Sequence, residues 1–364
     1  MRLTTLFGTR PETIKLAPLI KEGIEQGHEV KVIFTGQHRE MALPLLNFFG
    51  IKPDHDLNVM RPNQDLSSLT SLMLKLLDEN PELKNTDALM VQGDTTSAYV
   101  GAYWAFLNKI PVIHLEAGLR TYNIHSPFPE EANRQLISRI AKVHLAPTTN
   151  ALQSLHSEGI TKNTHVIGNT GIDALRIACE KVSDRNLPID IIDFIDDRKV
   201  VLITGHRREN FGEGMKQISI ALKTLSLSLP NVCFIYPLHM NPNVREVMKK
   251  ELRGLPNLLL TDPFPYLPFI ALMKKASVIL TDSGGIQEEA PSLRVPVVVM
   301  RDRTERPEGV ASGYSILVGT DPQKICAAVM HALEKGCEGR GENPFGDGRS
   351  SQKAWNILAG MKEQ

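Results

Sequence analysis

Six short segments of the chain place charged, hydroxyl and glycine residues directly after apolar runs. The segments read GTRPETIK, QGDTTS, EAGLRT, TGHRREN, DSGGIQEE and RDRTERPEG. Open parallel sheets bind their ligands beyond the carboxyl ends of the strands. Because all six segments would lie at such ends, we expect them to supply a binding site that contains both acidic and basic groups.

The acidic groups of this set are suited to proton transfer. Asp94 and Glu116 each follow a very apolar run, so each carboxyl group is expected at the floor of the site, where burial raises its pKa toward that of a general base. Glu130 and Glu131 follow SPFP, where the prolines end a loop and a helix begins. A helix cap or a structural ion pair would explain any one of these acids. Only the set as a whole indicates acid–base chemistry.

The segment DSGGIQEE is the clearest candidate for binding an anion. Asp282 or Ser283 can cap a helix that begins near Gly285. Gly284 and Gly285 would let a phosphate approach backbone N–H groups at the positive end of that helix. A tight turn between a strand and a capped helix, without any ligand, is the alternative explanation of this segment.

The basic groups suit the binding of phosphate. Arg10 precedes Pro11, a residue favoured in the first turn of a helix, and its guanidinium can clamp phosphate oxygens. His206 lies beside two arginines in GHRRE, and RDRTER contributes Arg301, Arg303 and Arg306. We expect at least half of these arginines to form surface or interdomain salt bridges.

The elements that would position these residues are short apolar runs alternating with amphipathic segments, the pattern of a parallel sheet with crossover helices. The first half is expected to contain strands at Leu3–Phe7, Val30–Thr35, Ala88–Val91, Val112–Leu115 and Val143–Ala146. The second half is expected to contain strands at Val200–Ile203, Val232–Tyr236, Leu258–Thr261, Val278–Thr281 and Val297–Met300. The polar stretch 183–199 lies between the two sets. The sequence therefore predicts an α/β protein with two Rossmann-like domains.

Composition excludes several other classes of protein. The 364 residues include 41 basic and 41 acidic side chains, so bulk charge does not favour binding to nucleic acid. The longest apolar stretch, Ala98–Leu107, has ten residues against the roughly 20 of a membrane span, and we expect a buried helix there. Four cysteines without a CxxC pair, and no secretion signal, favour a cytoplasmic protein. No GxGxxG, GxxxxGK[ST] or HExxH motif occurs, so neither NAD nor a metal is expected.

Ten motifs along nearly the whole chain resemble those of the bacterial non-hydrolysing UDP-N-acetylglucosamine 2-epimerases. In order they are FGTRPETIKLAPL, GQHRE, QGDTTS, HLEAGLRT, SPFPEEANR, GNTGIDAL, TGHRREN, HMNPNVRE, ILTDSGGIQEEAPSL and RDRTERPEGV. The resemblance implies the glycosyltransferase B (GT-B) architecture, with two Rossmann-like domains facing each other across a cleft. It places an N-terminal domain at 1–170, a UDP-binding domain at 171–349 and a final helix, 350–364, that returns to the first domain.

The resemblance also implies an activity, a partner and a set of site residues. The family interconverts UDP-GlcNAc and UDP-ManNAc without a cofactor, usually as a homodimer, and supplies ManNAc units for surface polysaccharide. It implies catalytic roles for Asp94, Glu116, Glu130 and His206. It implies UDP-sugar binding by Arg10, Lys15, Phe264, Phe269, Ser283, Gly284, Gly285, Glu289 and Arg306. In this set Arg10, Arg306 and also His206 contact the diphosphate, and Glu289 holds the ribose.

Two positions differ from the usual pattern of the family. Phe264 stands near the uracil site, where Leu or Gln is more common. Gln37 matches a residue of the allosteric UDP-GlcNAc site found in some members, but Glu40 and Asn63 do not match that site. The alternatives to the epimerase are a GT-B glycosyltransferase that uses a UDP-sugar, a hydrolysing 2-epimerase that releases UDP and ManNAc, and a non-catalytic sugar-nucleotide sensor.

Overall fold

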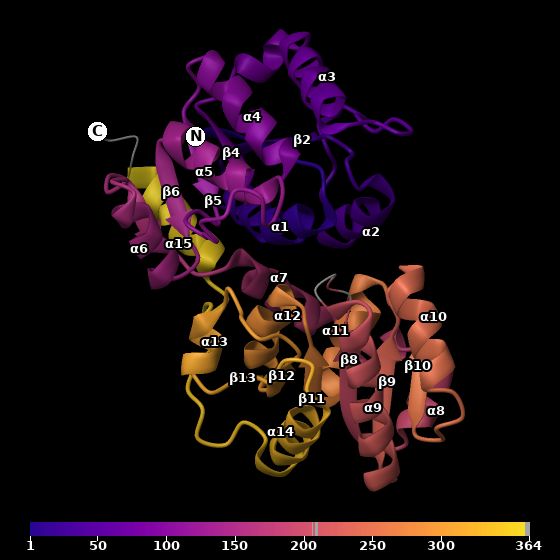
Figure 1. Cartoon of the computed structure of the whole chain (residues 1–364). Coiled ribbons are helices and arrows are strands. Elements are labelled where there is room, and N and C mark those ends of the chain that lie inside the picture. The colour runs from indigo at the N-terminus through magenta and orange to yellow at the C-terminus, as the bar shows by residue number, and fades with distance from the viewer. Residues whose placement is uncertain (206, 208–209, 361–364) are drawn as a thin grey trace. The chain divides into compact units, whose positions relative to one another are not determined.

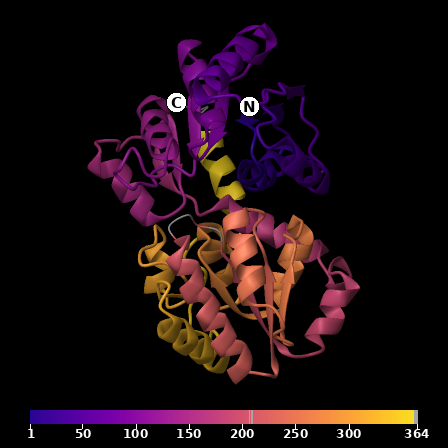
Figure 2. The same cartoon turned by 45° about the vertical axis from the view of Figure 1, so that its right-hand side comes forward.

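The computed structural model describes residues 1–205, 207 and 210–360 and divides the chain into two compact units. Unit 1 comprises Met1–Ala174 and the residues from Gly346 onward, and unit 2 comprises Leu175–Phe345. Each unit has its own parallel β-sheet with helices packed against it (Figures 1 and 2). The predicted α/β class is therefore confirmed.

The sheet of unit 1 has seven strands in the order β3-β2-β1-β4-β5-β6-β7. They are β1 Arg2–Phe7, β2 Glu29–Phe34, β3 His55–Asp56, β4 Ala88–Gln92, β5 Val112–Leu115, β6 Val143–Ala146 and β7 Thr164–Val166. The helices of this half of the chain are α1 Arg10–Glu25, α2 Arg39–Phe49, α3 Leu66–Asp78, α4 Thr96–Leu107, α5 Glu130–Ile140, α6 Thr149–Ser157 and α7 Thr170–Lys181, with a 3-10 helix at Pro81–Lys84. The division between the two units falls within α7.

The sheet of unit 2 has six strands in the order β10-β9-β8-β11-β12-β13. They are β8 Lys199–Thr204, β9 Val232–Pro237, β10 Leu258–Thr261, β11 Ala276–Thr281, β12 Val297–Val299 and β13 Ser315–Leu317. The helices are α8 Ile189–Ile195, α9 Glu213–Ser228, α10 Pro242–Glu251, α11 Tyr266–Lys275, α12 Gly284–Glu289, α13 Pro307–Ala311 and α14 Pro322–Lys335, with 3-10 helices at Asp184–Asn186 and Ala290–Leu293.

Each sheet reverses its winding direction at one point, where ligands bind in folds of this kind. In unit 1 this point lies between β1 and β4, which are neighbours in the sheet but 80 residues apart in sequence. The loops that follow these two strands carry Arg10 and Asp94. In unit 2 the reversal lies between β8 and β11, whose loops carry Arg207 and Ser283.

All ten predicted strands are present, with ends that differ by up to two residues. The three strands that the pattern does not indicate, β3, β7 and β13, have only two or three residues and lie at sheet edges. Edge strands that short lack the buried apolar run on which the prediction depends. The predicted helix at Ala98–Leu107 is α4, although Phe106 and Leu107 at its end are exposed rather than buried.

The last described helix, α15 Ser350–Gly360, belongs to unit 1 and packs on α1. The carboxylate of Asp173 accepts hydrogen bonds from the backbone N–H groups of Ser350 and Ser351 at 3.1 and 2.7 Å, which fixes the start of α15. The indole N–H of Trp355 donates to the carbonyl of Leu19 at 2.8 Å. Figures 1 and 2 show α15 (yellow) among the indigo to magenta elements of unit 1.

The described residues contain no helix with the length and apolar character that a membrane span requires.

Candidate active site

The first element of the site is the turn from β1 into α1, which is tied to the turn after β4. The side chain of Thr9 caps α1 by accepting a hydrogen bond from the backbone N–H of Glu12. In return, the buried carboxylate of Glu12 accepts a hydrogen bond from the backbone N–H of Thr9 at 2.8 Å. The other oxygen of Glu12 accepts from the Thr95 hydroxyl at 2.6 Å, and Thr95 itself caps α4. Burial raises the pKa of Glu12 despite these bonds. Glu12 therefore joins the loop that carries Arg10 to the loop that carries Asp94.

Asp94 lies in a largely buried position directly after β4. Its carboxylate forms an ion pair with Arg134 of α5, and its backbone carbonyl accepts from the Asn133 side-chain amide at 2.9 Å. Burial raises the pKa of Asp94, the nearby carboxylates of Glu116 and Glu130 raise it further, and Arg134 partly opposes these effects. Glu116 and Glu130 thus lie close enough to Asp94 to disfavour its ionisation, an arrangement suited to acid–base catalysis.

Glu116 lies after β5 and is held by two donors. Lys15 of α1 forms an ion pair with its Oε2 at 2.5 Å, and the amide of Gln92 donates to the same oxygen. The side chain of Glu116 is only 9% exposed, and its backbone has a φ of 63°, in the left-handed region. A non-glycine residue rarely adopts this conformation unless its surroundings enforce it, and such residues cluster at functional sites.

Glu130 and Glu131 open α5 but have different surroundings. Glu131 is fully buried and accepts from the backbone N–H groups of Thr121 and Tyr122 at 2.9 and 3.1 Å, with Arg134 at 3.3 Å. Through these bonds, Glu131 has a structural role and fixes the turn at 121–122. Glu130 remains partly exposed at the first position of the helix and acts electrostatically on Asp94.

Arg134 is the residue of this cluster that the sequence analysis does not single out. It bridges Asp94 and Glu131, and its side chain is 12% exposed. The only signal in the sequence is that Arg134 follows Glu130 by four residues, which places the two on one helix face. That spacing is too common in helices to identify a site residue.

Two other expected residues of unit 1, Arg10 and Gln37, also lie just beyond the carboxyl ends of strands. Arg10 is the first residue of α1, partly buried, and within the described part of the chain no carboxylate forms an ion pair with it. Gln37 lies after β2, and its Oε1 accepts from the Ser97 hydroxyl of α4 at 2.9 Å. Gln37 is thereby fixed against the start of α4.

In unit 2, the SGG segment starts α12, but its capping differs from the expectation. The helix begins at Gly284, and Ser283 is the N-cap residue without a side-chain capping bond. Asp282 does not cap the helix either. Its buried carboxylate accepts from the backbone N–H of Arg207 at 2.9 Å and from the Asn210 amide at 3.2 Å. The prediction of a side-chain cap was wrong because Asp282 finds its donors in the loop after β8.

Arg306 lies directly against Gly284 of this segment. Its Nε donates to Glu288 at 2.7 Å, and a Cβ atom added to Gly284 would lie 3.4 Å from the guanidinium carbon. Arg301 forms an ion pair with Glu305 at 3.3 Å. Two of the three arginines in RDRTER, Arg301 and Arg306, therefore form ion pairs within unit 2.

The remaining expected residues of unit 2 are partly buried. Phe264 lies in the loop between β10 and α11, Phe269 lies in the first turns of α11, and Glu289 ends α12. His206, which was expected to contact the diphosphate and to take part in catalysis, lies outside the described residues.

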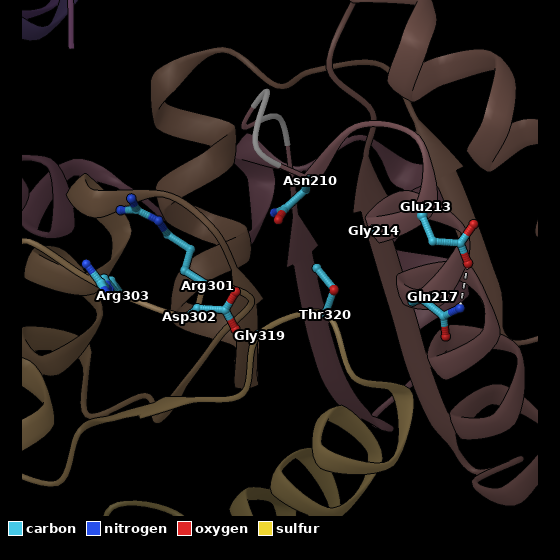
Figure 3. A pocket seen from close by; sticks show the side chains of 9 residues that line it. All are labelled: Asn210, Glu213, Gly214, Gln217, Arg301, Asp302, Arg303, Gly319 and Thr320. Atoms are coloured by element: carbon cyan, nitrogen blue, oxygen red, sulfur yellow. Dashed lines mark hydrogen bonds between the residues drawn. The ribbon is translucent and has the colours of Figure 1, made fainter. Parts of the chain in front are cut away.

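A cavity of about 500 Å³ in unit 2 adjoins these loops and shares Asn210 and Arg301 with them (Figure 3). It is lined by Asn210, Glu213, Gly214, Gln217, Arg301, Asp302, Arg303, Gly319 and Thr320. Figure 3 shows the Glu213–Gln217 hydrogen bond on one side of the cavity and Arg301 and Asp302 on the other. No described residue that was expected to bind UDP-sugar is among the lining residues.

Comparison with known proteins agrees with this fold. Residues 22–359 match the model of a family described as UDP-N-acetylglucosamine 2-epimerase. A UDP-N-acetylglucosamine 2-epimerase of Campylobacter jejuni is 46% identical over 98% of this chain and 97% of that protein. A crystal structure of the Neisseria meningitidis UDP-GlcNAc 2-epimerase bound to UDP-GlcNAc is 44% identical, with a TM-score of 0.88 over 99% of this chain and 100% of the other.

A more distant structure shows how general the fold is. The glycosyltransferase of kitacinnamycin has a TM-score of 0.60 at 14% identity, over 100% of this chain and 95% of that one, a likeness of fold alone. Two doubly wound sheets with polar loops at their reversal points thus define an α/β protein of the GT-B type. Within that class, the chain belongs to the UDP-N-acetylglucosamine 2-epimerase family.

Proposed function

We propose that this protein interconverts UDP-GlcNAc and UDP-ManNAc without hydrolysing either sugar nucleotide. Membership of the 2-epimerase family supports this substrate class. The Neisseria relative bound to UDP-GlcNAc, at 44% identity over nearly the full chain, supports the same substrate. The main support from this structure is the group of three carboxyl side chains. Asp94 lies near Glu116 and Glu130, and burial raises the pKa of Asp94.

The reaction needs acids and bases on both faces of the sugar ring. The proton on C2 is not acidic, because no carbonyl adjoins that carbon. Breaking the C1–O bond first sends its electron pair to UDP and leaves positive charge at C1, which makes the C2 proton removable. A carboxylate takes that proton to give 2-acetamidoglucal. UDP then adds back to C1 while a carboxylic acid delivers a proton to the opposite face of C2.

Asp94, Glu116 and Glu130 are the proposed acid–base groups for these proton transfers. Their different partners favour different roles. Glu116 is held beside the Lys15 ammonium, and Asp94 lies in a position where burial raises its pKa. A carboxyl group whose pKa is raised, as that of Asp94 is, can act as the acid of such a set.

The departing diphosphate needs compensating charge where its negative charge develops. We assign this role to Arg10, Arg306 and the Ser283–Gly285 loop, together with His206. Bare backbone N–H groups in a loop without side chains can approach phosphate oxygens closely. Phe264 and Phe269 are the proposed contacts for uracil, Glu289 for the ribose hydroxyls, and Lys15 for the UDP-sugar. Gln37 is assigned to an activator site for a second UDP-GlcNAc.

We also propose that the protein acts as a homodimer. Tyr103, Phe106 and Leu107 on α4 and Leu136 on α5 are exposed apolar side chains on helices that contact each other. Exposed apolar patches of this kind mark interaction surfaces. Phe106→Glu with Leu107→Glu should give a monomer by sedimentation velocity, and an unchanged mass would exclude this surface.

The proposed setting is the cytoplasm, with the product supplying ManNAc units for surface polysaccharide. Cys179, Cys233, Cys326 and Cys337 are all unpaired thiols, as expected in a reducing compartment. UDP-ManNAc is an activated sugar, and reactions that consume activated sugars build polysaccharides.

Phosphorus NMR of the purified protein with UDP-GlcNAc tests the proposed function. We expect UDP-ManNAc to appear while the total of the two sugar nucleotides stays constant. Release of UDP with free ManNAc would identify a hydrolysing epimerase, and transfer that requires an added acceptor would identify a glycosyltransferase. If the spectrum of UDP-GlcNAc does not change, the epimerase activity is rejected and the non-catalytic sugar-nucleotide sensor becomes the favoured alternative.

A further inference from the structure

His114 is a fully buried residue of β5 that contacts the turn carrying Asp94. Its Nε2 atom lies 2.7 Å from the carbonyl oxygen of Gly93. Gly93 has a φ of 67°, and Asp94 follows it directly. A side chain from one strand of the sheet therefore contacts the backbone immediately before an acid at the end of the neighbouring strand.

The chemistry of this contact fixes the tautomer of the ring. A carbonyl oxygen only accepts, so the Nε2 atom of His114 carries the hydrogen. Burial lowers the pKa of His114 to about 3, so the ring is neutral near pH 7 and Nδ1 has no proton. The Nδ1 atom is buried, and no donor among the described residues reaches it. The bond to Gly93 is thus the polar contact that orients the ring.

The turn is held at several further points. The Gly93 N–H donates to the Leu115 carbonyl at 2.9 Å, and the carbonyl of Asp94 accepts from Asn133 at 2.9 Å. These bonds do not fix the peptide plane between Gly93 and Asp94. The Gly93 carbonyl belongs to that plane, and its bond to His114 restrains the plane directly.

We propose that His114 is a positioning residue for Asp94, because its Nε2–H holds the Gly93–Asp94 peptide plane and thereby the direction of the Asp94 side chain. The inference rests on the proposed function, in which Asp94 takes part in proton transfer. A misplacement of about 1 Å in a reacting group can cost roughly 100-fold in rate. His114 therefore contributes to catalysis without touching the substrate.

The charges around the two residues make the effect measurable. Arg134, Glu116 and Glu130 act on Asp94, and His144, Arg120 and Arg134 act on His114. If the Asp94 carboxylate moves away from Arg134, it loses the charge that opposes the rise in its pKa. Loss of His114 should then shift the acidic side of the pH–rate profile upward.

His144 provides a matched control. It is the register partner of His114 on the adjacent strand β6, is 2% exposed, and has an Nδ1 atom that no donor in the described part of the chain reaches. Its ring bonds the backbone of Ala141 rather than the Asp94 turn. Replacing His144 removes a buried imidazole of the same kind without releasing the Gly93 carbonyl.

The test measures epimerisation of UDP-GlcNAc by wild type, His114→Phe, His114→Gln and His144→Phe, with KM and the pH profile for each. We expect His114→Phe to lower kcat about 10- to 100-fold with KM changed less than about threefold. We also expect an upward shift of the acidic side of the profile. His114→Gln, whose amide reaches about as far as Nε2, should restore most of the turnover, and His144→Phe should resemble wild type. His114→Asn, which keeps a small polar side chain but lacks the reach, replaces His114→Phe if that variant does not fold.

Turnover of His114→Phe or His114→Asn within about twofold of His144→Phe would overturn the positioning role. A Gln variant as slow as the Phe variant would also overturn it, since the donor would then be irrelevant. A wild type that forms no UDP-ManNAc would reject the proposed function itself, which is a different result from an active wild type with an equally active His114 variant.

Discussion

Asp94 and Arg134 form an ion pair that spans 40 positions of the sequence, and the same arginine reaches Glu131 at 3.3 Å. The buried Asp94 carboxylate therefore has its countercharge on α5, the helix that begins with Glu130. Unit 2 has a similar arrangement, with Arg306 paired to Glu288. The chain has 41 acidic and 41 basic side chains, and some of them form ion pairs within each unit.

Replacing Arg134 tests the role of this countercharge. Arg134→Gln removes the positive charge that opposes the raised pKa of Asp94, so a larger fraction of Asp94 should be protonated at a given pH. We expect turnover at neutral pH to fall about 10-fold or more and the acidic side of the pH–rate profile to move upward. Arg139→Gln, a change of an exposed arginine on the same helix, is the control. Equal profiles for the two variants would count against the assignment.

Neutralising Asp94 should separate activity from stability. Because burial raises the pKa of Asp94 above its unfolded value, the folded state favours the protonated form, and ionisation at neutral pH reduces stability. Asp94→Asn should therefore keep UDP binding and lose about 100-fold or more in turnover. It should be at least as stable as wild type at pH 7, since Arg134 keeps Glu131 as a partner.

Urea unfolding at two pH values checks the stability part of this prediction. The difference between Asp94→Asn and wild type should shrink as the pH falls through the folded pKa of Asp94, where wild type becomes neutral too. Retained turnover in both Asp94→Asn and Glu116→Gln would remove these residues from the catalytic set.

His144 should make the protein sensitive to acid. Burial lowers its pKa from 6.5 to about 4, so below pH 6.5 the unfolded chain takes up a proton that the folded chain does not. The stability from this group is present above pH 6.5 and is lost as the pH falls toward 4, by roughly 3 kcal/mol in total. His144→Phe should reduce the slope of the urea-unfolding free energy between pH 6.5 and 4, with the remaining slope including the contribution of His114. His125→Gln, at an exposed loop position, should keep the wild-type slope.

Gly118 should tolerate no side chain. It has a φ of 94°, and a Cβ atom there would overlap the carbonyl oxygen of Ala151. Gly159 has a φ of 79° with open space around it. Replacing it with Ala therefore measures the free-energy cost of the left-handed backbone alone, without steric overlap. We expect Gly159→Ala to cost about 1 kcal/mol and Gly118→Ala about 3 kcal/mol or more in the free energy of unfolding. Equal losses in urea unfolding would show that the overlap is relieved at no cost.

The sequence predicts the strands of both sheets well because each buried strand is a short apolar run. It does not indicate β3, β7 or β13, which lie at edges and have two or three residues each. The family resemblance implies a final helix that returns to the first domain, but not which helix it contacts there. Its place on α1 depends on Trp355 and Leu19, which are 336 positions apart.

The sequence also indicates Asp94, Glu116 and Ser283 as site residues, because polar groups after apolar runs fall at the carboxyl ends of strands. It cannot indicate Arg134, Glu12 or His114. Each of these acts through a contact with another loop or strand, and the residue type alone fits an ordinary surface charge, a helix cap or a core histidine. Even the left-handed backbone of Glu116 has no signal in the residue type.

The most direct test of the account follows the C2 proton. Proton NMR of wild type with UDP-GlcNAc in D₂O should show deuterium entering C2 as UDP-ManNAc forms, because a carboxyl group in exchange with solvent returns the proton. Asp94→Asn and Glu116→Gln should show neither change. UDP-ManNAc that keeps its original C2 hydrogen, or no UDP-ManNAc at all, would contradict proton transfer by these carboxyl groups.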